Sequence, residues 1–516
     1  MKTKNFLGAN PGPQVSVSEL PEVSAFDIFF TPAILQNICD LTNESFAAKF
    51  AKNPAKHKGK FPKIDVPELR AFLGVVIGIG LLQVRGSIRK YWSDECTLID
   101  TPGIRAIFSR TRFTQILRYL HYVDEQNVVT DRANPDYDNM YKVRMFFATL
   151  IPRFRSAYSP EQNLSLDESV IPGQSRMPAR QFLKNKPDRW GQKLFVVSEA
   201  KSGYVLNIEI YSGKTKGVSD EGATHDVVLR LMEPFYYIWH HVYMDRYYSS
   251  PTAYLALEAK AVLACGTVMP NRKGVPKDIT NKSVTKKMKR GESNFRQCKN
   301  TRMVAVTWKD SKTVTVLSTI PCDFATSPVK RLMKGATGWS AKDVPRPNVI
   351  GLYNANMGGV DMGNKKIKAY RRRFKGFRWP NKVFLYLVDA TILNAHILYT
   401  QCNPTVKLTL RQYRVRLCMQ LINGNTFRYI PPTPHAPAPE MRLNRQLNHA
   451  PMKYAKPGWC VVHEQRVDTT FGCKICNVKM CPVPCFEMYH YQLDYAFNDP
   501  ARQHKTAARK KPRAAK

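Results

Sequence analysis

Acidic side chains are scarce in this chain of 516 residues. Asp and Glu together number 40, against 79 for Lys and Arg, which gives a formal net charge of +39. An excess of this size requires an anionic partner or a solubilising role, and nucleic acid is the leading candidate ahead of a membrane surface. Hydrophobic residues make up 43% of the chain, which is ordinary for a globular protein.

Long apolar runs are also missing. The longest, Leu69 to Val84, is interrupted by Arg70 and Gln83 and is too short to span a bilayer. The first 14 residues contain lysines but no apolar core, so we expect no signal peptide and an intracellular protein. We therefore expect no membrane partner, and we expect the 12 cysteines to be thiols or metal ligands rather than disulfides.

The most informative short stretch reads N-L-S-L-D-E-S-V and spans Asn163 to Val170. Leu164 and Leu166 alternate with polar residues, which is the pattern of a strand with one buried face. Asp167 falls on the face opposite the two leucines, where a carboxylate can hold a metal ion at the rim of a sheet. The alternative is a surface strand that ends in a solvated Asp-Glu pair.

A second stretch, H-V-Y-M-D, repeats this arrangement and ends at Asp245. If the two strands are neighbours in one sheet, Asp167 and Asp245 emerge at the same end. Two such carboxylates repel each other unless a cation lies between them, and a divalent metal such as Mg²⁺ takes oxygen ligands. The candidate for a third ligand is Asp361, which follows two glycines at the start of a predicted helix.

The predicted elements indicate several domains. Helical patterns occupy 25–157, with Thr31 and Pro32 as an N-cap and first helical position. From Asn163 the order becomes three strands, helix, strand, helix, strand, which fits a ribonuclease-H-like α/β fold. Residues 309–312 are a predicted hairpin turn inside a β-rich insertion, and two further helices are predicted at 380–399 and 409–423.

The predicted fold class is therefore α/β plus α: a ribonuclease-H-like core interrupted by a β-rich insertion, flanked by a helical domain, with a C-terminal zinc-binding cysteine-rich module. Its predicted boundaries are a flexible tail (1–24), the first helical part (25–157), the first core part (158–270), the insertion (271–345), the second core part (346–371), the second helical part (372–430), a linker (431–458), the cysteine-rich module (459–492) and a basic tail (493–516).

Five of the cysteines crowd into a C-terminal cluster, between Cys460 and Cys485. Paired ligands two residues apart are a strong zinc signal. Four ligands make one tetrahedral site, so seven indicate two Zn²⁺ ions with an eighth ligand or a water unassigned. The pairing is not readable from the spacing, and the alternative is a set of reduced core cysteines. The seven predicted ligands are Cys460, His463, Cys473, Cys476, Cys481, Cys485 and His490.

A basic run from Lys365 to Arg378 contains eight cations, no acids and three aromatic residues. Such runs are usually solvated, but Arg suits phosphate and aromatic rings stack on bases, so we expect DNA contact here. The residues expected to bind DNA are Lys365, Lys366, Arg371, Arg372, Arg373, Lys375, Arg378 and Trp379.

Three blocks together resemble the catalytic blocks of the piggyBac transposase family: N-L-S-L-D-E-S-V, V-Y-M-D-R-Y-Y-S-S and Y-N-A-N-M-G-G-V-D. The resemblance implies a DNA transposase that cuts with water, transfers the freed 3′-OH and inserts at TTAA. Asp167, Asp245 and Asp361 would then bind Mg²⁺ or Mn²⁺.

The family resemblance also implies that the core is catalytic and that the helical domain is a DNA-binding and dimerisation domain. It also implies a cross-brace zinc module that binds the ends of the element. For the whole protein it implies double-stranded DNA as the partner, as terminal repeats and as the TTAA target, together with a homodimer and a nuclear location.

One position departs from the family pattern. The third block commonly reads G-G-V-D-x-x-D, but here the second Asp is Asn364. Asn364 shares a helical face with Asp361 and offers a neutral carbonyl oxygen but no charge, which weakens a second metal site. A domesticated, catalytically weak DNA-binding or chromatin-binding protein is therefore the first alternative. A zinc cross-brace adaptor that binds other proteins is an alternative of another class.

Overall fold

The computed structural model describes residues 5–492 apart from 9, 55–60, 85, 94–100, 174–176, 185–187, 214–217, 336–337, 373–377, 428–438 and 464–466. The chain divides into two compact units, Met1–Phe427 and Arg428–Lys516, which are described separately. The predicted basic tail, 493–516, lies outside the described residues.

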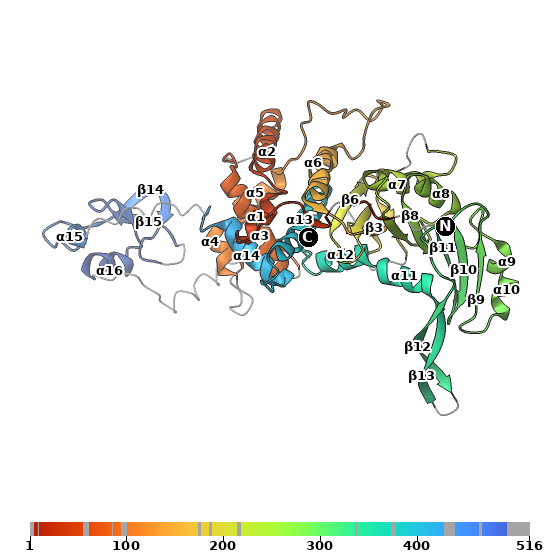
Figure 1. Ribbon diagram of the computed structural model, residues 1–516. Helices are drawn as coiled ribbons and strands as arrows, with labels where there is room; N and C mark the ends of the chain where they lie inside the picture. The colour runs from red at the N-terminus through yellow and green to blue at the C-terminus, as the bar shows by residue number, and fades with distance from the viewer. Residues whose placement is uncertain are drawn as a thin grey trace, which may run out of the picture. The chain divides into compact units, whose positions relative to one another are not determined.

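Helices form one part of the first unit (Figure 1). Sequence signals place their starts, because Thr31 accepts a hydrogen bond from Ile34 N and Ser109 from Arg112 N, as N-caps do. The predicted cap at Thr31 and Pro32 is confirmed. The helices are α1 (Glu22–Asp27), α2 (Pro32–Lys52), α3 (Val66–Leu82), η1 (Ile88–Trp92), α4 (Pro102–Ile107), α5 (Arg110–Tyr119), α6 (Tyr141–Ala157), α13 (Trp379–Cys402) and α14 (Leu410–Ile422).

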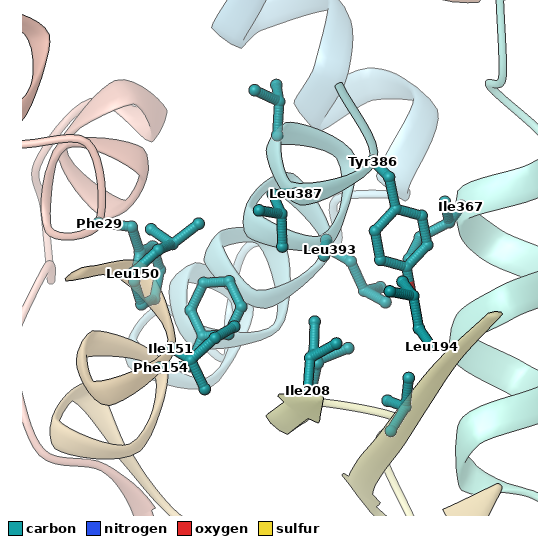
Figure 2. Close-up of a cluster of buried hydrophobic side chains, with 14 of the residues drawn as sticks. Phe29, Leu150, Ile151, Phe154, Leu194, Ile208, Ile367, Tyr386, Leu387 and Leu393 are labelled. Carbon is teal, nitrogen blue, oxygen red and sulfur yellow. The ribbon is translucent and has the colours of Figure 1, made fainter. Parts of the chain in front are cut away.

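Helix α13 joins the helical part to the sheet. Figure 2 shows Leu387 and Leu393 of α13 lying between Phe154 of α6 and the strand residues Leu194 and Ile208. The helix is long and apolar enough to cross a bilayer by length and composition, but 89% of its most apolar window is buried inside the protein. Its apolar residues therefore form the core of this unit, which is consistent with the absence of a charged stripe on its surface.

A mixed nine-stranded sheet forms the other part of this unit. Strands β4 (Gln181–Phe182), β5 (Trp190–Glu199) and β6 (Val205–Ile210) are antiparallel neighbours, and β5 also pairs with β3 (Asn163–Pro172). Strand β3 then runs parallel to β7 (His241–Met244), which runs parallel to β8 (Leu263–Thr267). Helices α7 (Ala223–Met232) and α8 (Pro251–Ala259) and turn η2 (Glu233–Phe235) fall in the connections, in the predicted order.

The β-rich insertion continues this sheet, because β11 (Thr313–Ser318) pairs with β8. Strands β10 (Val304–Lys309) and β9 (Ser293–Gln297) follow, and the predicted hairpin at 309–312 is confirmed. A second hairpin was not predicted from the sequence and projects from the body (Figure 1). The remaining elements here are α9 (Lys277–Thr280), α10 (Lys282–Lys287), that hairpin of β12 (Thr326–Gly335) and β13 (Gly338–Pro347), α11 (Asn348–Asn356) and α12 (Gly359–Lys368).

Two predicted unstructured segments are partly ordered. In the predicted flexible tail, β1 (Gly12–Pro13) pairs with β2 (Tyr158–Ser159), and Val17 is 2% exposed. A few apolar side chains and backbone hydrogen bonds are enough to hold this polar segment. In the predicted linker, β14 (Pro451–Trp459) is a full strand, because its backbone pairs with β15 (Asp468–Cys473) despite its two prolines.

The C-terminal unit is a small three-stranded sheet with two helices. Its strands follow the order β14, β15, β16 (Val478–Lys479), and its helices are α15 (Pro439–Arg442) and α16 (Cys485–Tyr491). Its buried core is largely made of the cysteines themselves, together with Val462, Val478, Met480 and Tyr489. A core of this size contributes little stability without a staple such as a metal ion.

Candidate metal-dependent DNA site

Asp167 and Asp245 hold equivalent positions on adjacent parallel strands. In the register of β3 and β7, Leu166 lies opposite Met244, so Asp167 follows within β3 and Asp245 is the first residue after β7. Adjacent strands lie about 5 Å apart, so the two backbones bring Asp167 and Asp245 close together at the point where β7 ends. The sequence-based expectation that these strands are neighbours is confirmed.

Asp361 reaches this region because α12 packs directly on β3 and β5. Val360 N donates a hydrogen bond to Ser165 Oγ at 3.0 Å. A Cβ atom on Gly359 would lie 2.5 Å from Ser165 Oγ and 2.6 Å from Glu199 O, so only glycine permits this approach. Gly359 therefore permits the close backbone approach that the two glycines led us to expect.

Asn364 lies one helical turn beyond Asp361. Its Nδ2 atom donates a hydrogen bond of 3.3 Å to the carbonyl oxygen of Glu168, which anchors α12 to the strand residue that follows Asp167. Asp361, Asn364 and Glu168 also line one cavity of about 610 Å³. The amide at position 364 therefore has a structural contact as well as a place beside the carboxylates.

Glu168 is a fourth carboxylate at this site, and sequence reasoning did not assign it a role. Its Oε2 atom lies 3.7 Å from Lys193 Nζ and 3.4 Å from the hydroxyl of Tyr248. Burial raises the pKa of Asp245, and the negative charge of Glu168 raises it further. Such mutual destabilisation of anions is relieved by a bound cation. The position of Glu168 directly after Asp167 was the sequence signal that could have identified it.

The carboxylates offer only oxygen donors, which fits a hard cation such as Mg²⁺ or Mn²⁺. Within the described residues, the groups whose ligand atoms all lie within 4.8 Å of one another are two Cys/His sets. Asp167, Asp245 and Asp361 are not among those groups, so the three carboxylates converge less closely than the cysteine-rich ligands do.

The basic run after Asp361 is divided between structural and accessible cations. Arg372 was predicted to bind DNA, but it is not available for this contact. Its side chain is 5% exposed, and its Nη2 atom lies 2.6 Å from Asp389 Oδ2. Arg371 pairs with Asp188 at 2.7 Å, and Lys366 Nζ donates to Ser202 O. Lys365 lines the cavity beside Asp361.

Four further residues were expected to bind DNA. Arg378 donates a hydrogen bond of 2.8 Å to Leu120 O, which ties its guanidinium to α5. Trp379 is half-buried and lines a separate groove together with Arg132 and Arg180. Arg373 and Lys375 lie outside the described residues.

In the C-terminal unit, the Cys/His ligands divide into two interleaved sets. The structure also supplies an eighth candidate ligand, His449, which sequence reasoning missed because it lies in the predicted linker. One set is His449, Cys473, Cys476 and His490, and the other is Cys460, His463, Cys481 and Cys485. The alternation of the two sets along the chain is a cross-brace.

The geometry of these sets fits tetrahedral zinc. With ordinary Zn–S and Zn–N bond lengths, neighbouring sulfur and nitrogen ligands lie about 3.5 Å apart. His449 Nδ1 lies 3.4 Å from Cys473 Sγ and 3.5 Å from Cys476 Sγ, and His490 Nε2 lies 3.5 Å from Cys476 Sγ. The other ring nitrogen of His490 lies 2.8 Å from Phe486 O, an arrangement typical of a zinc-bound histidine.

Comparisons with known proteins agree with this architecture. The sequence matches the family described as Transposase IS4 over residues 22–396. It is 26% identical to human PiggyBac transposable element-derived protein 3, over 91% of this chain and 78% of the relative. It is 24% identical to human PiggyBac transposable element-derived protein 2, over 79% of this chain and 66% of the relative.

A solved structure has the same fold. The cryo-EM structure of a piggyBac transposase synaptic complex with hairpin DNA superposes with a TM-score of 0.68 at 22% sequence identity, covering 81% of this chain and 83% of that one. The family match covers most of the chain, the three blocks that contain Asp167, Asp245 and Asp361 lie within it, and the mixed α/β fold is shared. The chain belongs to the Transposase IS4 family and, within it, to the piggyBac transposases.

Proposed function

We propose that this chain is a DDD-type DNA transposase with a ribonuclease-H-like core, which cuts DNA strands and joins them at TTAA. The observation that carries the proposal is the matched register of Asp167 and Asp245 on parallel strands. Asp361 completes the triad from α12, which packs on β3 through Val360 and Ser165. Three carboxylates around one sheet edge suit a phosphoryl-transfer site.

Mg²⁺ or Mn²⁺ would be held by Asp167, Asp245 and Asp361, and when bound it supplies charge stabilisation for the attacking and leaving oxygens of a phosphodiester. The chain's own residues position these groups. Tyr247 N donates a hydrogen bond of 2.8 Å to Asp245 Oδ1, and Glu168 N donates one of 2.7 Å to Asp167 Oδ1. These bonds orient the two carboxylates before DNA arrives.

Double-stranded DNA is the proposed partner, both as terminal repeats and as the TTAA target. The formal charge of +39 supports this, as does the hairpin DNA in the related piggyBac complex. Two Zn²⁺ ions in the cross-brace would fold the C-terminal unit into a DNA-end reader. We further propose that the protein acts as a homodimer in the nucleus, since two element ends must be joined.

Strand cleavage of DNA carrying a TTAA-flanked element tests the proposal. We expect Mg²⁺-dependent cleavage by the unaltered chain and a loss of at least a hundredfold in Asp245→Ala, with DNA binding retained. Asp278→Ala is the matched control, because Asp278 is half-exposed and only pairs with Arg296 at the surface. No cleavage by the unaltered chain would contradict the proposal.

A domesticated DNA-binding protein is the second candidate, and Asn364 favours it. The side-chain amide of Asn364 is neutral where the family pattern has an aspartate, and its Nδ2 atom donates a hydrogen bond to Glu168 O. Under this alternative the unaltered chain binds terminal repeats but leaves them uncut.

A zinc cross-brace adaptor is the alternative of another class. It would bind acidic or histone peptides and have no affinity for DNA, a result that the net charge of the chain and the three carboxylates argue against.

A further inference from the structure

A groove of about 730 Å³ lies in the first unit, outside the carboxylate site. We call it the stacking groove. It is rich in aromatic and basic side chains, and among the described residues that line it there is no carboxylate. Its lining residues are Arg132, Tyr137, Asn139, Met177, Pro178, Ala179, Arg180, Trp190 and Trp379.

Trp190 is the most prominent of these side chains. It begins β5, and it is 40% exposed next to Phe182, which is its cross-strand partner on β4 and is 49% exposed. The two ring centroids lie 4.8 Å apart. The guanidinium of Arg180 lies 4.6 Å from the centroid of Trp190. From that position Arg can contact a ring and a phosphate together.

Asn139 adds a directional polar group to the groove. Its Nδ2 atom donates a hydrogen bond of 2.6 Å to Ser212 O, which fixes the orientation of the amide. Its Oδ1 atom is buried and accepts no hydrogen bond from the described residues. Asn139 is therefore a fixed part of the groove wall. Asp138, its neighbour, is neutralised by Arg144 at 2.8 Å.

Trp190 of the stacking groove lies on β5, the strand that pairs with β3, which carries Asp167. Asp167 lies opposite Val196 of β5, and Trp190 lies six residues before Val196 on that strand. This spacing corresponds to about 20 Å. One DNA strand is therefore long enough to contact both the carboxylate site and the groove.

We propose that the stacking groove binds unpaired nucleotides of a DNA strand. Their bases stack on Trp190 and Trp379, and their phosphates pair with Arg132 and Arg180. Paired bases are already stacked within a duplex, whereas unpaired bases expose both faces to an aromatic ring. The inference rests on the proposed function. It adds that the DNA held near the cleavage site is unpaired.

The test compares two labelled oligonucleotides by fluorescence polarisation: a short thymidine strand and a strand of equal length with abasic sites at its centre. Both carry the same phosphates, so the +39 charge attracts them equally. We expect the unaltered chain to bind the thymidine strand about tenfold or more tightly. Trp190→Ala should weaken this preference several-fold, and Trp190→Phe should keep most of it. The double variant Trp190→Ala with Trp379→Ala should remove the preference.

Trp339→Ala is the matched control, because Trp339 is 70% exposed on the β13 strand of the projecting hairpin. It should leave the preference unchanged. Equal binding of the two strands by the unaltered chain would overturn the inference. So would a preference that is undiminished in Trp190→Ala or that survives in the double variant, provided that thermal unfolding shows all variants to be folded.

Failure of this inference is distinguishable from failure of the proposed function. Cleavage without a preference for the thymidine strand would remove the stacking groove alone. A preference that depends on Trp190, without cleavage, would keep the groove and remove the transposase activity.

Discussion

The Nδ1 atom of His449 lies 3.4 Å from the sulfur of Cys473, a residue 24 positions later in the chain. This contact makes His449 the eighth candidate ligand of the two Cys/His sets. We predict that His449→Ala lowers the zinc content from two ions per chain to about one, because its set retains three ligands. Metal analysis of purified protein measures this. Cys298→Ser, at an exposed cysteine of the first unit, should keep both ions.

If His449→Ala still binds two ions with unchanged affinity, His449 is not a ligand. Chelator titration separates the outcomes, since a site with three protein ligands should lose its metal at a lower chelator concentration.

Asn364→Asp should increase cleavage. The change adds a carboxylate beside Asp361 and Glu168 at the loss of one 3.3 Å hydrogen bond to Glu168 O. We expect half-maximal cleavage at a Mg²⁺ concentration several-fold lower, because the added charge strengthens cation binding. Asn364→Ala loses the same hydrogen bond without adding charge and is the matched control. Equal Mg²⁺ dependence in both variants would show that position 364 does not face the metal.

Asp389→Ala should strongly destabilise the first unit. Asp389 is 2% exposed and pairs with Arg372 at 2.6 Å and with Arg414 at 3.0 Å. Removing the carboxylate leaves two buried guanidinium groups without their counter-ion, at a cost of about 3–5 kcal/mol in the free energy of unfolding. Urea unfolding measures the loss. Asp278→Ala, at a half-exposed pair, should cost about 1 kcal/mol or less.

Acid should destabilise the first unit partly through His240. Burial lowers the pKa of this imidazole to about 4, while a histidine in the unfolded chain titrates near its ordinary value of 6.5. Between these values the unfolded state binds more protons, so stability is full above pH 6.5 and falls as the pH falls toward 4. The loss between pH 7 and 5 is on the order of 2 kcal/mol for this group.

His240→Gln should therefore lose less stability than the unaltered chain over the same pH range, whatever its stability at pH 7. Urea midpoints at pH 7 and pH 5 measure the difference. Parallel losses in the two proteins would show that His240 titrates normally in the fold.

Local features could be predicted from the sequence because their causes lie within a few residues. Thr31 and Ser109 cap the helices that follow them, and the 309–312 turn joins two strands of alternating pattern. Cysteine spacing pointed to seven of the eight residues in the two Cys/His sets. These features depend on residues close together in the chain, so the order of residues carries the information.

Other features depend on partners far away in the chain. The sequence places Arg372 in a basic run, but Asp389 and Arg414 bury it in an ion-paired network. His449 lies in a segment that resembles a linker and becomes a ligand only when Cys473 and Cys476 reach it. Composition predicts the charge or chemistry of such residues, but tertiary packing decides which group they contact.

The sequence by itself determined that Asp167 and Asp245 each follow an alternating strand pattern and that Asp361 begins a helix after two glycines. The strand that carries Asp167 continues beyond it to Pro172, because its backbone also pairs with β5. Only the tertiary structure decided that the first two share a register, because strand pairing is set by non-local hydrogen bonds. It also decided that Gly359 lets α12 approach β3, since no local pattern specifies which backbone a glycine will meet.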